Sequence, residues 1–375
     1  MRKFKIAILT ESVSSHSGAR APVEIAKNLA KVGHEVEIFA KKGKHDLKLI
    51  RELTKFKVKT VLLDSPKTLM SRFLPNLELL GILKKQKPDL AILAAQLPYH
   101  LSAKLAQIKT VRIYMGTQFN AYLEKNNNWE KINIFDKILN FFANRVIYMS
   151  ELISTHLSSY LIAVSYYCAT EVKKLYGRKV DKTVYLGGNH FDVAEIVPQA
   201  RPFTLLSVSR ITPYKNFHLL LDAVNLSKHK QEIVFYIVGP KINSSYLQSL
   251  KKTGPTNTKV LLNITNSQLT KLYARSHLYL TADRYLFFGF PIAESAFFQK
   301  PSIAFDFAAA REIIKNGQTG FIVKNAQEMA EKIDFLFENR LVLKQLGKNA
   351  FVQANKLFDW NKISRQYQKI FYKII

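Results

Sequence analysis

Short apolar runs alternate with longer amphipathic stretches along the whole chain. The first example is an apolar run at 4–10, a polar loop, an amphipathic stretch at 23–32 and a second apolar run at 35–40. A buried strand, a helix and another buried strand at this spacing predict a right-handed parallel βαβ unit. The alternation continues, so we predict an α/β fold with parallel sheets. Further strands are expected at 90–94, 110–114, 203–208, 233–238, 260–262 and 277–281.

The length of the chain and a polar stretch near its middle predict more than one domain. A chain of 375 residues exceeds what one hydrophobic core usually organises. The polar, proline-marked stretch 197–202 is typical of a linker between domains. We therefore predict one Rossmann-like domain at 1–197, a second at 203–355, and a final helix at 356–375 that carries aromatic residues at helical spacing.

Composition narrows the class of protein. An apolar content of 47% with 22% charged residues is typical of a globular chain. The single cysteine, Cys168, excludes a disulfide framework and fits a reducing, cytoplasmic compartment. The apolar run 6–9 is too short for a signal peptide, and no stretch reaches the length of a membrane span. No carboxylate pair or His/Cys cluster has metal-ligand spacing, so we expect no metal site.

The net charge of +28 is large and is spread over both halves of the chain. Such an excess favours acidic partners: nucleic acid, anionic lipid headgroups or nucleotide sugars. The motifs of nucleic-acid-binding proteins are missing, so we expect no nucleic-acid partner. The basic stretch 51–87 contains apolar segments at 69–74 and 77–83. These segments fit either amphipathic helices on an anionic membrane face or crossover helices that cover the sheet.

One strand–loop–helix pattern carries two cations. The strand 203–208 runs into Arg210, and a proline-containing turn then leads to Lys215 at the start of an amphipathic helix. A forked guanidinium and a compact ammonium at the carboxyl end of a parallel strand suit a diphosphate. The alternative is a pair of solvated surface cations.

A second strand–loop–helix pattern predicts an anion site at a helix start. The strand 277–281 leads through a polar corner to Gly289 and Pro291, which are typical of the first turn of a helix. Unpaired N–H groups and the helix dipole attract phosphate there. Glu294, on the first turn, is placed to accept hydrogen bonds from sugar hydroxyls. The alternative is a βα corner that serves only as scaffold.

Together, these two patterns resemble the retaining glycosyltransferases of family 4, which have the GT-B fold. Ser209-Arg210 to Lys215-Asn216 is similar to the family's (G/S)-R-x-x-x-x-K-(G/N), and 288–294 is similar to the end of its E-G-F-G-x-x-x-x-E segment. The resemblance implies two Rossmann-like domains facing across a cleft, with the first on the acceptor side and the last helix crossing back to it. It also assigns 144–148, 160–165 and 184–189 to the last strands of the N-terminal domain, and 300–304 to a later strand.

The resemblance implies transfer of a hexose-type sugar from a nucleotide diphosphate to an acceptor hydroxyl, with retention and without a metal cofactor. The acceptor would be a glycolipid or a precursor of a cell-surface (cell-envelope) glycan. The protein would be cytoplasmic or peripheral on the inner face of the membrane, where it would meet a lipid-linked acceptor. Arg210, Lys215 and Glu294 would be catalytic. Nucleotide-sugar contacts are expected from Gly18, Gly239, Ile264, Gly289, Phe290, Pro291 and Ile292.

Three departures from the family pattern keep a second function open. Leu286 stands at the family's first acidic position, Met115 stands where relatives often have histidine, and only Gly18 remains in the first loop. Asp283 either replaces the missing acid or is a simple loop carboxylate. The alternative function is therefore a degenerate relative that binds a nucleotide or a protein without turnover. An epimerase or phosphorylase would need catalytic groups that we cannot place.

Overall fold

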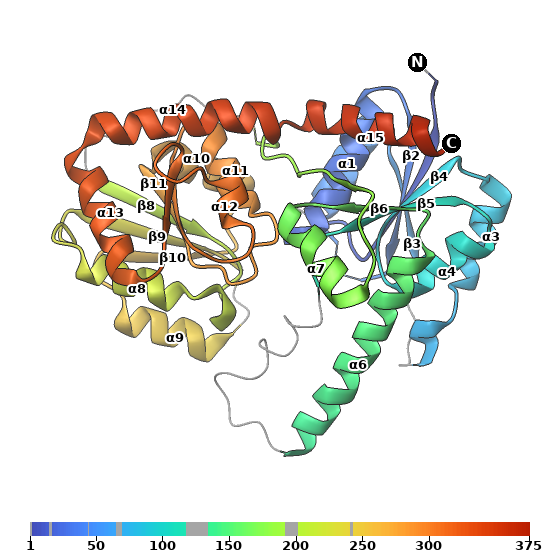
Figure 1. The fold of residues 1–375 in the computed structure, drawn as a ribbon, viewed down its shortest axis with the longest axis horizontal. Helices are drawn as coiled ribbons and strands as arrows, with labels where there is room; N and C mark the ends of the chain where they lie inside the picture. Colours follow the sequence, from blue (N-terminus) through green and yellow to red (C-terminus); the bar gives the residue numbers. More distant parts are fainter. Residues whose placement is uncertain are drawn as a thin grey trace. The chain divides into compact units, whose positions relative to one another are not determined.

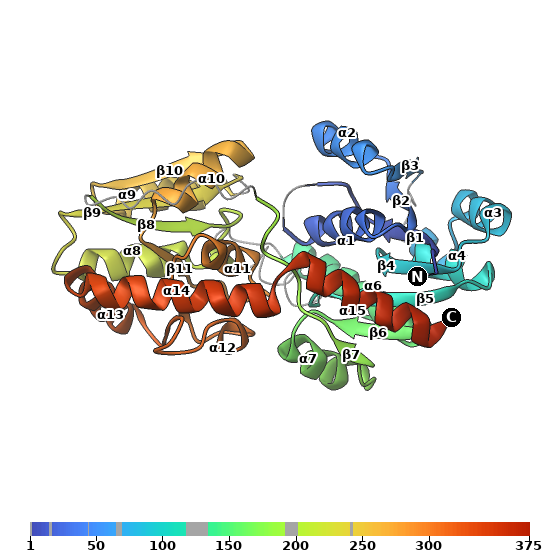
Figure 2. The ribbon, with the colours of Figure 1, turned by 90° about the horizontal axis from the view of Figure 1, so that it is seen from above.

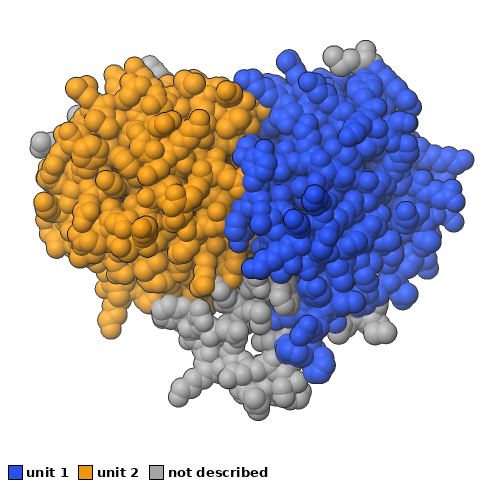
Figure 3. Space-filling model, viewed as in Figure 1, with its two compact units in different colours: residues 1–119, 134–185, 360–375 blue, residues 120–133, 186–359 orange. Residues whose placement is uncertain are grey.

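A computed structural model of the chain (Figures 1 and 2) describes residues 2–14, 17–43, 45–64, 70–117, 134–191, 202–240 and 243–375. The described residues form two compact units (Figure 3). The first unit holds the described residues up to 117, then 134–185 and 360–375, and the second holds those of 186–359. Most of the predicted linker, 197–202, lies outside the described residues, and the predicted domain boundaries stay predictions.

The first unit is built on a seven-stranded sheet of order β3-β2-β1-β4-β5-β6-β7, in which all neighbours run parallel. Its strands are β1 (Lys5–Thr10), β2 (Glu35–Lys41), β3 (Lys59–Leu63), β4 (Leu90–Ala94), β5 (Lys109–Tyr114), β6 (Tyr160–Ala163) and β7 (Lys182–Thr183). Its helices are η1 (Ser17–Ala19), α1 (Arg20–Lys31), α2 (Leu47–Lys55), η2 (Met70–Phe73), α3 (Leu77–Gln86), α4 (Leu97–Leu105), α6 (Ile134–Leu157), α7 (Tyr166–Tyr176) and α15 (Trp360–Ile374).

The second unit is built on a six-stranded parallel sheet of order β10-β9-β8-β11-β12-β13. Its strands are β8 (Phe203–Val208), β9 (Ile233–Gly239), β10 (Thr258–Leu262), β11 (Leu278–Thr281), β12 (Ser302–Phe305) and β13 (Gly320–Val323). Its helices are η3 (Pro213–Lys215), α8 (Phe217–Leu226), α9 (Ser244–Thr253), α10 (Asn266–Arg275), α11 (Phe290–Phe297), α12 (Ala310–Ile313), α13 (Ala326–Glu338) and α14 (Arg340–Leu357).

The predicted α/β class with parallel sheets is confirmed, and several of the apolar runs that we expected as strands are buried along most of their length. The run at β1, for example, is buried at every position after Lys5. The run 144–148 was wrongly assigned to a strand and lies inside α6. Its apolar part is only 146–148, too short to be told from a helix segment by its pattern, and here the surrounding 24-residue helix decides. The run 184–189 was also wrongly assigned, since β7 ends at Thr183.

The basic stretch 51–87 contains a crossover helix. Leu79 and Leu83 of α3 are fully buried in the same apolar cluster as Leu63 and Leu93, which lie on β3 and β4. The apolar side of α3 therefore covers the sheet, as one of the two interpretations predicted. Residues 65–69 lie outside the described part of the chain. Within that part, no helix has both the length and the apolar composition that crossing a bilayer demands.

The last helix, α15, packs on the first unit beside α1, which confirms that the chain returns to its first unit. His34 joins the two ends of this unit. Its Nδ1 accepts a hydrogen bond from the backbone N–H of Phe4 at 3.1 Å, and its Nε2 lies 3.2 Å from the side-chain amide of Gln368. Burial lowers the pKa of His34, so the neutral ring that can accept this bond is favoured.

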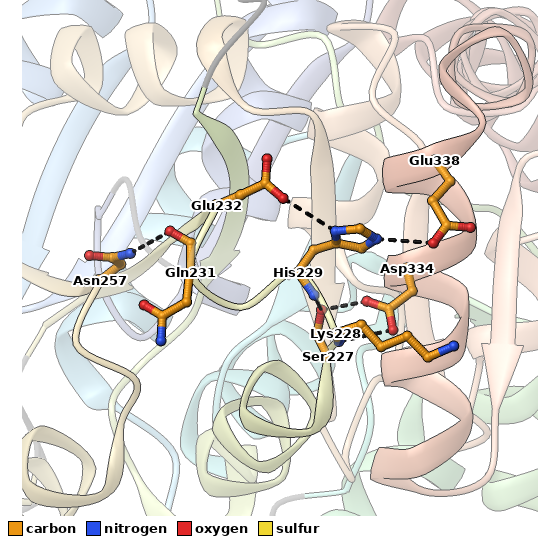
Figure 4. Close-up of polar contacts among 8 residues, drawn as sticks. All are labelled: Ser227, Lys228, His229, Gln231, Glu232, Asn257, Asp334 and Glu338. Carbon is orange, nitrogen blue, oxygen red and sulfur yellow. Dashed lines mark hydrogen bonds and ion pairs between the residues drawn. The ribbon is translucent and has the colours of Figure 1, made fainter.

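A polar cluster joins the loop before β9 to helix α13 in the second unit (Figure 4). Ser227 Oγ donates to one oxygen of Asp334, and the backbone N–H of Lys228 donates to the other at 3.1 Å. The His229 ring stacks on Phe337 at 4.0 Å and bridges two carboxylates, with Nε2 3.0 Å from Glu338 and Nδ1 3.3 Å from Glu232. The hydrogen bond to Glu338, more than any other contact, raises the pKa of His229.

We predict that His229→Gln destabilises the second unit more at about pH 6 than at about pH 8.5. A histidine with a raised pKa in the folded state contributes stability that is present below its unfolded pKa of about 6.5 and is lost as the pH rises through the folded value. Because Glu232 and Glu338 are about half exposed, the pH-dependent part should stay below about 1 kcal/mol. Thermal unfolding of both proteins at the two pH values measures it. An equal loss of stability at both pH values would contradict the ion-pair interpretation. His229 would then contribute only through its stacking on Phe337.

Candidate functional site

The two predicted strand–loop–helix patterns meet at the topological switch point of the second sheet. From β8 the chain adds β9 and β10 on one side, and it then returns to β11 on the other side of β8. β8 and β11 are therefore parallel neighbours, with Leu205 opposite Leu278 and Leu206 opposite Tyr279. In open parallel sheets, ligands bind at this point, outside the carboxyl ends of the strands.

An ion pair joins the loops that follow β8 and β11. The ammonium of Lys215 contacts the Asp283 carboxylate, and each side chain is only 12% exposed. Beside it, the side-chain amide of Asn216 donates to the carbonyl of Ala282 at 3.1 Å. The other Asp283 oxygen accepts from the backbone N–H of Tyr285 at 3.0 Å. Asp283 is thus a fixed partner of Lys215 in this structure.

Both predicted cations lie over the ring of Tyr214. The guanidinium carbon of the half-buried Arg210 lies 5.9 Å from the ring centroid, and Lys215 Nζ lies 5.1 Å from it. Both distances are within the range of cation–π attraction. Tyr214 is itself buried and packs against the Tyr285 ring at 5.9 Å. The structure therefore brings Arg210 and Lys215 together, as the sequence predicted.

Gly239 explains how the Arg210 loop is supported. A Cβ added at Gly239, the last residue of β9, would lie 1.8 Å from the carbonyl oxygen of Ser209. Only glycine allows β9 to pass so close to the residue before Arg210. Ile264 lies beyond β9, in the loop from β10 to α10, and is half-buried. Gly18 belongs to the first unit, where it is exposed in η1.

The start of α11 has the backbone form that the sequence predicted. Gly289 precedes Phe290 with a φ of +81°, a conformation that favours glycine, and Pro291 occupies the first turn. The N–H of Ile292 donates to the carbonyl of Gly289 at 3.0 Å, and proline has no N–H. Of these four residues, only Gly289 and Phe290 can therefore offer a backbone N–H to a ligand.

Leu286 fills space rather than carrying charge. Its side chain is buried, and a Cβ added at Gly289 would lie 2.8 Å from its Cδ1. Its carbonyl accepts a hydrogen bond from the N–H of Ala309 at 3.0 Å. The position at which we noted a missing acid is thus part of the packing beneath the start of α11.

Glu294 is buried and held at both oxygens. His190 Nε2 lies 2.9 Å from Oε1, and Tyr273 Oη donates to Oε2 at 2.6 Å. His190 follows β7 and Tyr273 lies on α10, so both partners are distant in sequence. Sequence reasoning missed them because no local pattern connects either residue to Glu294.

Tyr279 is influenced by both acidic groups of the site. Its hydroxyl donates to the carbonyl of Val208, at the end of β8, at 3.3 Å. Burial raises the pKa of Tyr279, and the charges of Glu294 and Asp283 raise it further. Both carboxylates therefore act on one phenol at the carboxyl edge of the sheet. In the described residues, His, Cys, Asp and Glu side chains do not gather in threes that could hold a metal ion.

Two family models match the chain in succession. The model of Glycosyltransferase Family 4 matches residues 19–186, and that of Glycosyl transferases group 1 matches residues 191–353. The chain belongs to glycosyltransferase family 4. The site residues of the second unit described above fall in the part that matches the group 1 model, except His190, which immediately precedes it. Gly18 lies outside that part, in the first unit.

Curated members of the family match over part of their length. The trehalose synthase of Thermococcus litoralis is 26% identical over 182 residues, which cover 46% of this chain and 44% of that protein. The GtfA subunit of the UDP-N-acetylglucosamine–peptide N-acetylglucosaminyltransferase of Streptococcus pneumoniae is 27% identical over 134 residues, 35% of this chain and 26% of that protein. The chain thus matches less than half of the length of these relatives.

Solved structures confirm the family's GT-B fold. Anabaena HepE in complex with UDP and glucose has a TM-score of 0.76 at 18% identity, over 99% of this chain and 100% of that one. A glycosyltransferase from Rickettsia africae has a TM-score of 0.73 at 21% identity, over 100% and 99% of the two chains. At these identities the likeness concerns the fold.

Proposed function

We propose that the chain transfers a sugar from a nucleotide diphosphate to an acceptor hydroxyl with retention of the anomeric configuration. One observation carries the proposal: Arg210 and Lys215 lie over the same ring, that of Tyr214, at the switch point of a parallel sheet. The loop after the neighbouring strand β11 leads to the start of α11. Membership of family 4 supports it. The family-like fold is also found in a protein solved with UDP and glucose.

In this proposal, catalysis consists chiefly of stabilising the leaving group. The bond from the anomeric carbon to the β-phosphate oxygen breaks, the acceptor oxygen bonds to that carbon, and the proton of the acceptor hydroxyl passes to the released diphosphate. Arg210, Lys215 and the N–H groups of Gly289 and Phe290 neutralise the charge that grows on the β-phosphate. Once phosphate has displaced Asp283 from Lys215, these groups need no further reorganisation when the charge develops. Charge neutralisation is assigned to protein groups, without a metal.

The remaining predicted residues have supporting roles. Glu294 accepts hydrogen bonds from the ribose, the backbone near Ile264 holds the edge of the base, and Gly18 admits the phosphates. Gly239 supports the Arg210 loop. The acceptor class that we propose is a glycolipid or a cell-surface glycan precursor, met in the cytoplasm or at the inner face of the membrane.

A binding module without turnover is the second candidate function. The observation that favours it is Leu286, whose buried hydrocarbon takes the place of the family's first acid. Such a module would still use Arg210 and Lys215 to bind a nucleoside diphosphate. Release of UDP from UDP-sugars in the presence of a cell lipid extract distinguishes the two functions, because only the enzyme consumes the donor.

We predict that Arg210→Ala weakens UDP binding in calorimetry and lowers the kcat of transfer by about 100- to 1000-fold, as loss of one preorganised donor to a developing charge does. Arg275→Ala, at an exposed residue of α10, is the matched control and should change neither quantity. Unchanged UDP affinity in Arg210→Ala would refute the phosphate role. Weakened binding in a protein that never turns over would support the binding module.

We predict that Asp283→Asn tightens UDP binding by up to about tenfold, because phosphate then reaches Lys215 without displacing a carboxylate. Asp222→Asn, at an exposed residue of α8, changes the net charge equally and should leave affinity unchanged. Calorimetry with UDP and with a UDP-sugar measures both variants. If Asp283→Asn instead weakens binding of the UDP-sugar alone, Asp283 contacts the sugar in place of the acid missing at Leu286.

We further propose peripheral binding to anionic membranes through the first unit. Leu74 and Leu77, before and at the start of α3, are 60% and 75% exposed, and the cations Lys84, Lys85 and Lys87 at the end of α3 are exposed as well. Apolar side chains flanked by lysines are typical of a membrane-surface contact.

We predict that the chain sediments with phosphatidylcholine vesicles containing about 30% phosphatidylglycerol and is released at about 0.5 M NaCl. Reversing the charges of Lys84 and Lys85 to Glu should weaken sedimentation. The same reversal at Lys251 and Lys252, exposed on α9 of the second unit, is the control. Equal loss in both double variants would show a net-charge effect and contradict a site at α3.

A further inference from the structure

Residues 186–191 run directly against α11. The N–H of Gly188 donates to the carbonyl of Phe358 at 2.8 Å, and the side-chain amide of Asn189 donates to Asp359 at 2.7 Å. A Cβ added at Gly188 would lie 2.7 Å from the carbonyl carbon of Ala293, so the two backbones nearly touch. The segment is thus anchored on both sides before it reaches His190.

The anchored segment delivers His190 to a buried carboxylate. The side chains of His190 and Glu294 are 2% and 4% exposed, and their contact is 2.9 Å long. Tyr273 donates to the other oxygen of Glu294 at 2.6 Å. Both oxygens of the carboxylate are therefore held by side chains from two other elements.

Aromatic rings fix these two donors. The His190 ring lies 4.5 Å from that of Phe191 and 6.2 Å from that of Phe290. The Tyr273 ring stacks on Phe298 at 5.4 Å and an interplanar angle of 15°. Packed rings restrict the rotamers of His190 and Tyr273, so the direction of the Glu294 carboxylate is restricted too.

A carboxylate can accept more hydrogen bonds than the two that His190 and Tyr273 make with Glu294. A carboxylate has about four lone-pair sites, two on each oxygen. His190 and Tyr273 each take one of these sites. A fixed carboxylate of this kind suits a vicinal diol, whose two hydroxyls can each donate to one oxygen.

We propose that His190 is a positioning residue that orients Glu294 toward the two ribose hydroxyls, and that it thereby sets the preference for ribonucleotides over 2′-deoxyribonucleotides. The inference rests on the proposed function, because it takes the nucleotide of the donor as the ligand of Glu294. His190 does not touch the nucleotide. It acts by donating from Nε2 to Oε1, which prevents the carboxylate from rotating away from the diol.

The test compares nucleotides that differ by one hydroxyl. UDP, ADP and GDP are screened by calorimetry, and the one that binds most tightly is compared with its 2′-deoxy form. We expect the unmodified protein to prefer the ribonucleotide by roughly tenfold or more, the effect of one lost hydrogen bond to a charged group. His190→Leu should lower this ratio toward one by weakening the ribonucleotide. His190→Gln, whose amide can replace the Nε2 donor, should largely restore the ratio.

Two further variants distinguish a positioning role of His190 from a general loss of structure. Tyr273→Phe removes the donor on the other oxygen and should also reduce the ratio, so the test does not depend on the folding of His190→Leu alone. Arg210→Ala should weaken both nucleotides equally and leave the ratio unchanged. An equal loss of both nucleotides in His190→Leu and Tyr273→Phe would overturn the inference. So would an unmodified protein without ribose preference, whereas failure of Arg210→Ala to affect either nucleotide would overturn the proposed function itself.

Discussion

The ion pair of Lys215 and Asp283 is the contact on which the arrangement of the second unit's site depends. Sheet hydrogen bonds hold β8 and β11 side by side, but the loops beyond them are joined by these two side chains and by Asn216. Each charge is almost buried, and an isolated charge so far from water is costly. An anion that comes to Lys215 must therefore exchange with a carboxylate that is already there. Without a ligand, the charge of Lys215 is thus neutralised by Asp283.

Glu294 shows a different solution to the same problem. His190 contacts one of its oxygens, and Tyr273 donates a hydrogen bond to the other. Donors of this kind stabilise the carboxylate without using all of its acceptor sites. Asp283 is thus paired with the charge of Lys215, which a ligand can take over, whereas the carboxylate of Glu294 is held in one direction. The charges of both carboxylates raise the pKa of Tyr279.

Local patterns predicted much of the fold and part of the site. Apolar runs bounded by polar loops predicted the parallel strands, and Arg210, Lys215, Gly289 and Glu294 stood out because each follows a strand at a short, fixed distance. The run 144–148 was assigned wrongly because its three apolar residues, 146–148, are compatible with either a strand or the helix that surrounds them. His190, Tyr273 and the pairing of Lys215 with Asp283 were beyond prediction, since each joins residues that only the completed fold brings together.

The return of α15 to the first unit has a consequence for biosynthesis. Residues 186–359 are inserted between two parts of that unit, whose last part, 360–375, leaves the ribosome after the whole second unit. Until then, the surface of α1 that α15 covers and the rings of Phe4 and His34 lack Phe371 against them. The part of the second unit at 186–359 is complete before α15 is made, so its core can form first. Nascent chains of this protein therefore pass through an interval in which the earlier-made unit exposes apolar surface, the condition that chaperones recognise.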